Sequence, residues 1–411
     1  MDTLVERCAG LDVHKDTVVA CVRTPGEGRA RDEVTRTFGA TTAELLALRD
    51  WLVACGVTLV GMESTGVYWK PPFYVLEDAV ECWLLNARHL RNVPGRKTDV
   101  GDAAWICRLV EHGLVRPSFV PPKPIRELRN LTRYRKAQIE ERSREAQRLD
   151  KILQDAGVKL SSVATDILGT SGRAMLAALV EGTRDPDVLA ALARGTLRKK
   201  IPALRQALEG RFGTHHGLIV GQILAKLDFL DEAIATLSEE IDGVIAPFES
   251  QIELLVTVPG IDQRTAECLV AEIGVDMARF GSAQRLASWA GMCPGHYESA
   301  GKQTSGKARK GPKWLGITLT EAAKAAGRTK ETYLGAQYQR LRGRLGAAKA
   351  TKAVAHSMLV AIFHMLDRGV SYHELGADWF TKRAPEQHAR KLIRQLTALG
   401  YTVTVQPPEA A

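Results

Sequence analysis

The order of strand-like and helix-like segments in the first 115 residues constrains the fold more than any other feature. "CAGLDVHKDTVVACVRT" alternates apolar and polar residues on both sides of "VHKD", which predicts two strands joined by a tight turn. "TRTFGA" predicts a third short strand, and "TTAELLALRDWLVACG" has a Thr cap and apolar residues at helical spacing. The remaining segments are a strand at "VTLVGMES", a helix near "FYVLEDAV", a strand at "ECWLLN" and a helix through "DVGDAAWICRLVEHG".

Three strands followed by alternating helices and strands is the order of a ribonuclease-H-like α/β domain, which we expect at residues 1–115. "RPSFVPPKP" follows this segment, and prolines at this density stop helices and favour an extended linker. A chain of 411 residues also exceeds what one hydrophobic core normally supports. At least one further domain is therefore expected after the prolines.

Residues 123–250 are helical in pattern, and we expect a coiled-coil region that mediates oligomerisation. Apolar residues recur at helical intervals from Ile125 to about Ala156, amid 10 Lys/Arg and 5 acidic residues between Lys123 and Lys151, which predicts a long exposed helix. "LIVGQILAKLDFLDEAIATLSEEIDGVIA" predicts a second long helix. The heptad of the first helix is ragged, which leaves its place in a coiled coil open. The two helices could pair with each other or between subunits.

The long helical segments end near Pro247. Residues 251–370 predict a mostly helical C-terminal domain, and residues 371–411 a C-terminal tail. "VPGIDQRTAECLVAEIG" is similar to a helix-hairpin-helix segment, whose amides would face a phosphate at a helix N-terminus. Asp262 stands where such hairpins have a second glycine and would oppose an anion. A purely structural hairpin is therefore an equal alternative.

The positive charge is concentrated in one segment. The formal net charge is +9, yet Ser299–Lys352 alone has 13 Lys/Arg against Glu321 and Glu331, a net of +11, so the rest sums to −2. This predicts an anionic partner such as nucleic acid. The residues expected to contact phosphate are Lys302, Lys307, Arg309, Lys310 and Lys313. A second basic group is expected either to contact phosphate or to be a solvated face; it comprises Arg88, Arg91, Arg96 and Lys97.

Two features concern the compartment. No apolar run reaches the roughly 18 residues that span a bilayer, and "MDTLVERC" lacks the layout of a signal peptide, so we expect a cytoplasmic protein without a membrane partner. The seven cysteines contain no CxxC, which argues against a zinc site or a disulfide framework and predicts buried free thiols.

Four acids of the first domain stand where strands and helices would bring them together. Asp12 lies in the first strand, Glu63 ends the strand "VTLVGMES", and Asp99 and Asp102 are spaced i, i+3 at the start of a helix. Hard oxygen ligands from several elements suit Mg²⁺ or Mn²⁺. The alternative is that Asp99 caps a helix and Asp12 belongs to a turn. Glu63 would carry a large desolvation cost unless it is paired with a cation or metal.

The motifs "GLDVHKD", "GMESTGVYW" and "RKTDVGDAAWI" resemble the Asp-Glu-Asp-Asp core of RuvC-like transposases of the insertion-sequence family numbered one hundred and ten. "GMCPGHYESAGK…ARKG" resembles that family's C-terminal transposase domain. The resemblance implies that Asp12, Glu63, Asp99 and Asp102 bind metal and that Ser299 is the nucleophile. Ser299 precedes Ala300 rather than the family's glycine, so Ser305, which precedes Gly306, is a rival. Either His296 or Tyr297 could be a proton shuttle or a packing residue.

The same resemblance implies an activity. The chain would cut and rejoin donor and target DNA by metal-assisted attack of a serine, through a covalent phosphoserine–DNA intermediate, with a structured bridge RNA as guide. A serine hydroxyl needs such assistance because it is a poor nucleophile at neutral pH. Holding two duplexes favours a homo-oligomer, a dimer or a tetramer. The alternatives are a RuvC-like structure-specific nuclease that uses water, and a non-catalytic nucleic-acid-binding scaffold.

Overall fold

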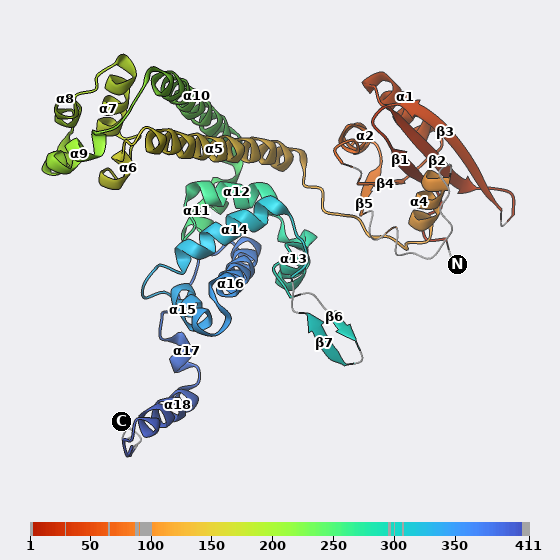
Figure 1. Ribbon diagram of the computed structural model, residues 1–411. Helices are drawn as coiled ribbons and strands as arrows, with labels where there is room; N and C mark the ends of the chain where they lie inside the picture. The colour runs from red at the N-terminus through yellow and green to blue at the C-terminus, as the bar shows by residue number, and fades with distance from the viewer. Residues whose placement is uncertain are drawn as a thin grey trace. The chain divides into compact units, whose positions relative to one another are not determined.

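The computed structural model of the chain (Figure 1) describes residues 3–28, 30–64, 66–86, 90, 101–294, 297–299, 301–305 and 308–404. Only the backbone is described for residues 297–299, 302–305 and 387. The chain forms two compact units, which meet in sequence between Val120 and Pro121, inside the proline-rich stretch. An α/β unit is thus followed by a helical one, as the sequence predicts.

The first unit is built on a five-stranded mixed sheet with the order β3-β2-β1-β4-β5 (Figure 1). Its strands are β1 (Cys8–Val13), β2 (Thr17–Pro25), β3 (Arg31–Gly39), β4 (Leu59–Glu63) and β5 (Glu81–Leu85). β1, β2 and β3 pair antiparallel in sequence order, whereas β4 is parallel to β1 and β5 to β4. β3 begins earlier than the predicted "TRTFGA" strand. It is a mostly exposed edge strand, so its first half carries no apolar alternation.

Helices cover both faces of this sheet. They are α1 (Thr42–Ala54), α2 (Lys70–Leu76) and α4 (Asp102–Glu111). Leu45, Leu48 and Leu52 of α1 pack with Leu11 of β1 on one face, together with α2. α4 packs on the other face against Cys8 and Leu59. Successive residues of β1 and β4 therefore point alternately toward α1 and toward α4.

Two glycines let α4 lie directly on the sheet. A Cβ at Gly10 would lie 2.2 Å from the carbonyl oxygen of Ala103 and 2.3 Å from the amide nitrogen of Cys107. A Cβ at Gly61 would lie 2.5 Å from a methyl group of Val110. Only glycine permits this approach of helix backbone to strand backbone.

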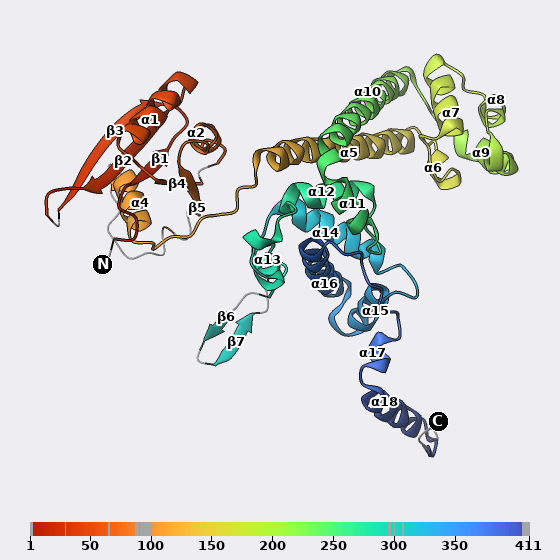
Figure 2. The same cartoon turned by 180° about the vertical axis from the view of Figure 1, so that it is seen from behind.

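The second unit begins with two long antiparallel helices that lie side by side (Figures 1 and 2). They are α5 (Lys123–Asp155) and α10 (Thr214–Ile245), close to the two predicted long helices. They pair within one chain. At the end where α5 stops and α10 starts, shorter helices share a core with Leu149, Leu153 and Leu227. These helices are α6 (Leu160–Val163), α7 (Thr170–Glu181), α8 (Pro186–Ala191), η2 (Gly195–Lys200) and α9 (Ile201–Leu208).

The arginines of α5 are not all solvated, as an exposed helix would require. Arg135 and Glu267 form an ion pair in which both side chains are about 2–3% exposed. Arg133 makes two hydrogen bonds to the Glu272 carboxylate, at 2.6 and 2.8 Å. Glu267 and Glu272 belong to α12 (Gln263–Ile273), so α5 is fixed to the C-terminal helices by paired charges.

The remaining helices follow η3 (Ala246–Phe248). They are α11 (Glu249–Val256), α12, η4 (Met277–Arg279), α13 (Ala283–Trp289), α14 (Lys313–Ala326), α15 (Tyr333–Leu345), α16 (Ala347–Arg368), α17 (Trp379–Lys382) and α18 (Pro385–Ala398). A two-stranded hairpin, β6 (Tyr297–Ser299) and β7 (Lys302–Ser305), lies between α13 and α14. The predicted tail thus contains two helices. No helix in the described ranges has the length and apolar character needed to cross a membrane.

The hairpin between α11 and α12 packs against protein. A Cβ at Gly260, whose φ is +88°, would lie 2.5 Å from the carbonyl oxygen of Ala322 in α14. The Asp262 side chain accepts a hydrogen bond from the Thr265 amide at 2.9 Å, which occupies the N-terminus of α12. Both interactions fit the purely structural alternative for this segment.

Candidate metal site and serine-bearing hairpin

Asp12 and Glu63 stand at matching positions at the ends of two neighbouring strands. In the parallel pair of β1 and β4, the last register partners are Leu11 and Met62, and each acid is the next residue. Adjacent strands lie about 4.8 Å apart. The two carboxylates therefore start from neighbouring points at the same edge of the sheet.

Both acids point to the face that α4 covers. Gly10 and Gly61 face α4, since a Cβ at either position would meet that helix, and side chains two residues apart on a strand share a face. Asp12 is two residues beyond Gly10, and Glu63 is two residues beyond Gly61. Both acids are only partly exposed.

α4 brings a third acid to the same edge. The helix runs antiparallel to β1, because the carbonyl oxygen of Glu111 at its end accepts hydrogen bonds from Leu4 and Val5, before the strand begins. Its start is accordingly near the end of β1, and Ala103 touches Gly10. Asp102, the first residue of α4, is partly buried there. Three of the four predicted acids thus start from the same edge of the sheet; Asp99 lies outside the described residues.

His14 is a further member of this group. Its Nε2 lies 3.1 Å from Oδ2 of Asp12, and its side chain is 59% exposed. The amide of His14 donates to the carbonyl oxygen of Thr17 at 2.9 Å, so the tight turn between β1 and β2 brings the ring back over the strand end. His14 is not among the predicted site residues, and the tight turn predicted at "VHKD" was the only sign of this contact in the sequence.

Ser299 lies in a β-hairpin. Ser299 is paired with Lys302, and Tyr297 with Ser305, around a turn that contains Gly301 with φ of +77°. The small residues "SAG" are suited to such a turn. Ser299 is consequently next to the tip of the hairpin, whereas Ser305 is nearer its foot.

The predicted phosphate contacts are described only in part. Arg309, Lys310 and Lys313 are exposed and follow the hairpin, before and at the start of α14. The structure gives no account of several other predicted groups. These are the side chain of Lys302 and residues His296, Lys307, Arg88, Arg91, Arg96 and Lys97.

A second group of possible ligands, in the helical unit, is explained by helix capping. Ligand atoms of Asp155, His215 and His216 lie within 4.8 Å of one another. Nδ1 of His216 accepts a hydrogen bond from the Gly213 amide at 3.0 Å, so Nε2 carries the proton that faces Asp155 Oδ2 at 3.0 Å. A neutral ring in this state has no lone pair left for a metal. This group instead joins the start of α10 to the end of α5.

The acids and the serine hairpin fall in segments that match two family models. Residues 9–157 match an IS110 model of the DEDD type, described as a transposase. Residues 252–339 match the model described as the transposase IS116/IS110/IS902 family. Both matches define the same class, a DNA transposase or recombinase.

The two models name one family and together span more than half of the chain. The chain therefore belongs to the IS110 family of transposases, as its motifs predict. The comparison with curated proteins gives no match.

Proposed function

We propose that this transposase cuts and rejoins DNA by attack of Ser299 on a phosphodiester, assisted by a divalent cation. The cation would be held by Asp12, Glu63, Asp99 and Asp102 in a ribonuclease-H-like domain. The observation that supports the proposal is that β1, β4 and α4 carry three of these acids at the same edge of one sheet face. Three carboxylates from separate elements are costly to bring together without a cation.

The donors at this edge fit Mg²⁺ or Mn²⁺. The acids offer oxygen atoms only, which hard divalent cations prefer. Such a cation, when bound, supplies Lewis-acid stabilisation of the negative charge that develops on phosphate oxygens. The protein must hold its carboxylates in fixed positions. The close packing of α4 against Gly10 and Gly61 provides this rigidity.

The serine step is a transesterification. The Ser299 oxygen forms a bond to phosphorus and loses its proton, while the bond from phosphorus to one deoxyribose oxygen breaks and that oxygen takes up a proton. In rejoining, a deoxyribose hydroxyl of another strand attacks the phosphoserine and releases the serine hydroxyl. The position of Ser299 beside the hairpin tip, rather than at its foot like Ser305, supports its assignment.

The partners follow from charge and from the reaction. The net +11 of Ser299–Lys352 suits phosphate contacts with donor and target DNA. Sequence would be read by a structured bridge RNA through base pairing. Exchange of strands between duplexes calls for a dimer or tetramer, working in the cytoplasm.

The test is whether protein becomes covalently linked to DNA. Wild-type protein with Mg²⁺, its RNA and cognate DNA should give a protein–DNA adduct that maps to Ser299 by mass spectrometry. Ser299→Ala should bind DNA but give no adduct, whereas Ser305→Ala should retain it. Asp12→Asn or Glu63→Gln, or removal of metal with EDTA, should abolish cleavage and leave DNA binding in place.

Other results would support other functions. Free nicked ends with no adduct would identify a nuclease that uses water. Metal-independent binding without any cleavage would identify a scaffold. Near wild-type cleavage by both acid variants would refute the metal site.

A further inference from the structure

A cavity of about 700 Å³ lies at the foot of the serine hairpin. Pro294 and Ala308, which form a bridge just outside β6 and β7, both line it. Its volume is in the range of about 300–1,000 Å³ that is typical of small-molecule sites. Its lining combines residues on either side of the hairpin with residues of α15 and α16.

One wall of this cavity is cationic. Lys349 and Lys352 are spaced i, i+3 on α16 and therefore lie on one side of the helix. Burial lowers the pKa of Lys352, and no carboxylate is in an ion pair with either lysine among the residues that the structure describes. A half-buried ammonium group without a carboxylate nearby is suited to an anionic ligand.

The rest of the lining is apolar with a polar edge. Met292 and Pro294, which precede the hairpin, supply carbon surface, and so does Ala353 of α16. Gln337 donates from Nε2 to Oγ of Ser357 at 2.9 Å, while its Oε1 is closed off from solvent and has no hydrogen-bond partner in the described part of the chain. A modest rotation of this amide would offer the acceptor to an N–H group of a ligand. Burial also lowers the pKa of His356, so its ring is neutral at pH 7.

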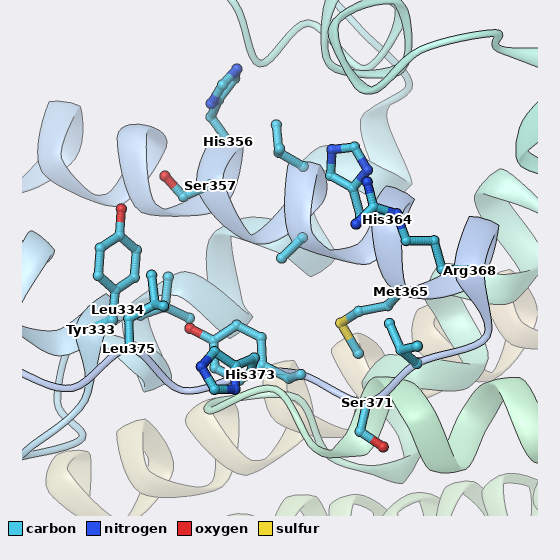
Figure 3. A pocket seen from close by; sticks show the side chains of 14 residues that line it. Tyr333, Leu334, His356, Ser357, His364, Met365, Arg368, Ser371, His373 and Leu375 are labelled. Carbon is cyan, nitrogen blue, oxygen red and sulfur yellow. The ribbon is translucent and has the colours of Figure 1, made fainter. Parts of the chain in front are cut away.

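A second cavity along α16 has a different lining. It has a volume of about 400 Å³, shares His356 and Ser357 with the first, and has Arg368 in place of the two lysines (Figure 3). In Figure 3 the ring of His356 points away from His373, which lines this second cavity. Of these two cavities, only the first is lined by residues at the foot of the serine hairpin.

We propose that the first cavity receives one unpaired nucleotide of the DNA strand that Ser299 attacks. Its phosphate contacts Lys349 and Lys352, and its base lies against Met292, Pro294 and Ala353. This inference rests on the proposed function. Ser299 is five positions after Pro294, so the cavity is at most about 18 Å from the serine. That span corresponds to about five nucleotides of a B-form strand.

The reaction itself creates the ligand. Bases near a cut must leave their old partner before they pair with a new strand, and an unpaired base loses stacking. A cavity at the foot of the hairpin holds such a base beside the cut strand. An RNA nucleotide is the competing occupant, and the position of the cavity next to the serine hairpin favours DNA.

The experiment uses photo-crosslinking of the full-length protein. The probe is pentadeoxythymidylate with 5-iodouracil at its centre, and mass spectrometry locates the cross-link. We expect it at Met292 or His356. Ala353→Phe, which fills the cavity, should abolish the cross-link, and Lys352→Met should raise the probe concentration for half-maximal cross-linking about tenfold. Lys391→Met, which removes an exposed lysine on α18, is the matched control and should have no effect.

Circular dichroism and thermal unfolding must first establish that each variant is folded. A cross-link elsewhere, or one that survives Ala353→Phe, overturns the proposal. Pentauridylate that competes tenfold better than pentadeoxythymidylate assigns the cavity to RNA instead. Because cross-linking needs no catalysis, an adduct at Ser299 without this cross-link refutes the cavity alone. A cross-link without the adduct refutes the serine chemistry alone.

Discussion

Nε2 of His14 lies 3.1 Å from Oδ2 of Asp12, so one carboxylate of the candidate metal site is already oriented by a hydrogen bond. The Asp12 side chain is only 15% exposed, whereas that of His14 is 59% exposed. The ring therefore fixes the acid without being part of the core. Hydrogen bonds of this kind to metal ligands commonly matter about 10- to 100-fold for affinity.

We expect His14→Ala to weaken Mn²⁺ binding about tenfold, because the Asp12 carboxylate loses its orienting partner. Electron paramagnetic resonance of free Mn²⁺ measures this directly. Unfolding in denaturant should change by less than about 0.5 kcal/mol, since the side chain is mostly exposed. Unchanged Mn²⁺ affinity would mean that the contact between His14 and Asp12 does not position the metal ligand. Asp12→Asn is the control, because it removes a charged metal ligand.

The close packing of α4 on β1 predicts how a substitution at Gly10 affects the stability of the first unit. Gly10→Ala places a methyl group 2.2 Å from a backbone oxygen of α4, where no side chain can move aside, and should lower the free energy of unfolding of the first unit by about 3 kcal/mol. Gly243→Ala in α10 is the control. Nothing lies within 4 Å of the added methyl group there, so it should stabilise the helix by up to about 1 kcal/mol. Hydrogen exchange of β1 and α10 amides in the full chain measures both.

The sheet and the strand-end positions of Asp12 and Glu63 were largely predictable because their causes are local. Alternating apolar residues on both sides of "VHKD" require two strands, and an acid that ends the apolar strand before Ser64 requires a partner. The register that sets Asp12 beside Glu63 was not predictable, because it depends on pairing between segments about fifty residues apart.

The arginines of α5 show more clearly that tertiary contacts could not be predicted from the sequence. Arg133 and Arg135 belong to a helix rich in charged residues, which predicts solvent exposure, and only tertiary packing pairs them with Glu272 and Glu267. Helical periodicity reports which residues share a face, but not whether that face meets water or another helix. The hairpin around Ser299 was missed for a related reason. Its strands are three and four residues long, too short for alternation to be recognised.

The stability of the packing of α5 against α10 should depend on pH. Hydrogen bonds from Lys226 and Arg144 lower the pKa of Glu141 to about 2, from an ordinary value of 4.5. A depressed carboxyl pKa contributes stability that is fully present above pH 4.5 and is lost as the pH falls toward 2. Lys226→Met should raise the pKa of Glu141, so the stability would be lost over a narrower pH range. NMR titration of the Glu141 side chain would report this change in pKa. An unshifted titration in the variant would mean that Lys226 does not hold this carboxylate in solution.

Nucleic-acid affinity should depend on salt through the residues after the hairpin. Arg309 and Lys310 are exposed, and removing one cation that neutralises a phosphate should lower the slope of log affinity against log salt by about 0.9. We expect this reduction for Arg309→Ala and for Lys310→Ala in fluorescence anisotropy with duplex DNA. Lys391→Ala serves as the control of equal charge. Equal slopes for all three variants would place the phosphate-binding cations elsewhere.

The last prediction concerns which subunit completes the active site. The acids and Ser299 belong to separate compact units of the chain, and strand exchange needs two duplexes cut within one assembly. We therefore expect Ser299→Ala and Asp12→Ala proteins, each inactive alone, to recover some cleavage when mixed. A mixed assembly can join an intact acid cluster from one subunit to an intact serine from another. The double variant mixed with Ser299→Ala is the control and should remain inactive, because no serine is present. If size-exclusion chromatography with differently tagged subunits proves that mixed assemblies form, and they still do not cleave, each site must be built within one subunit.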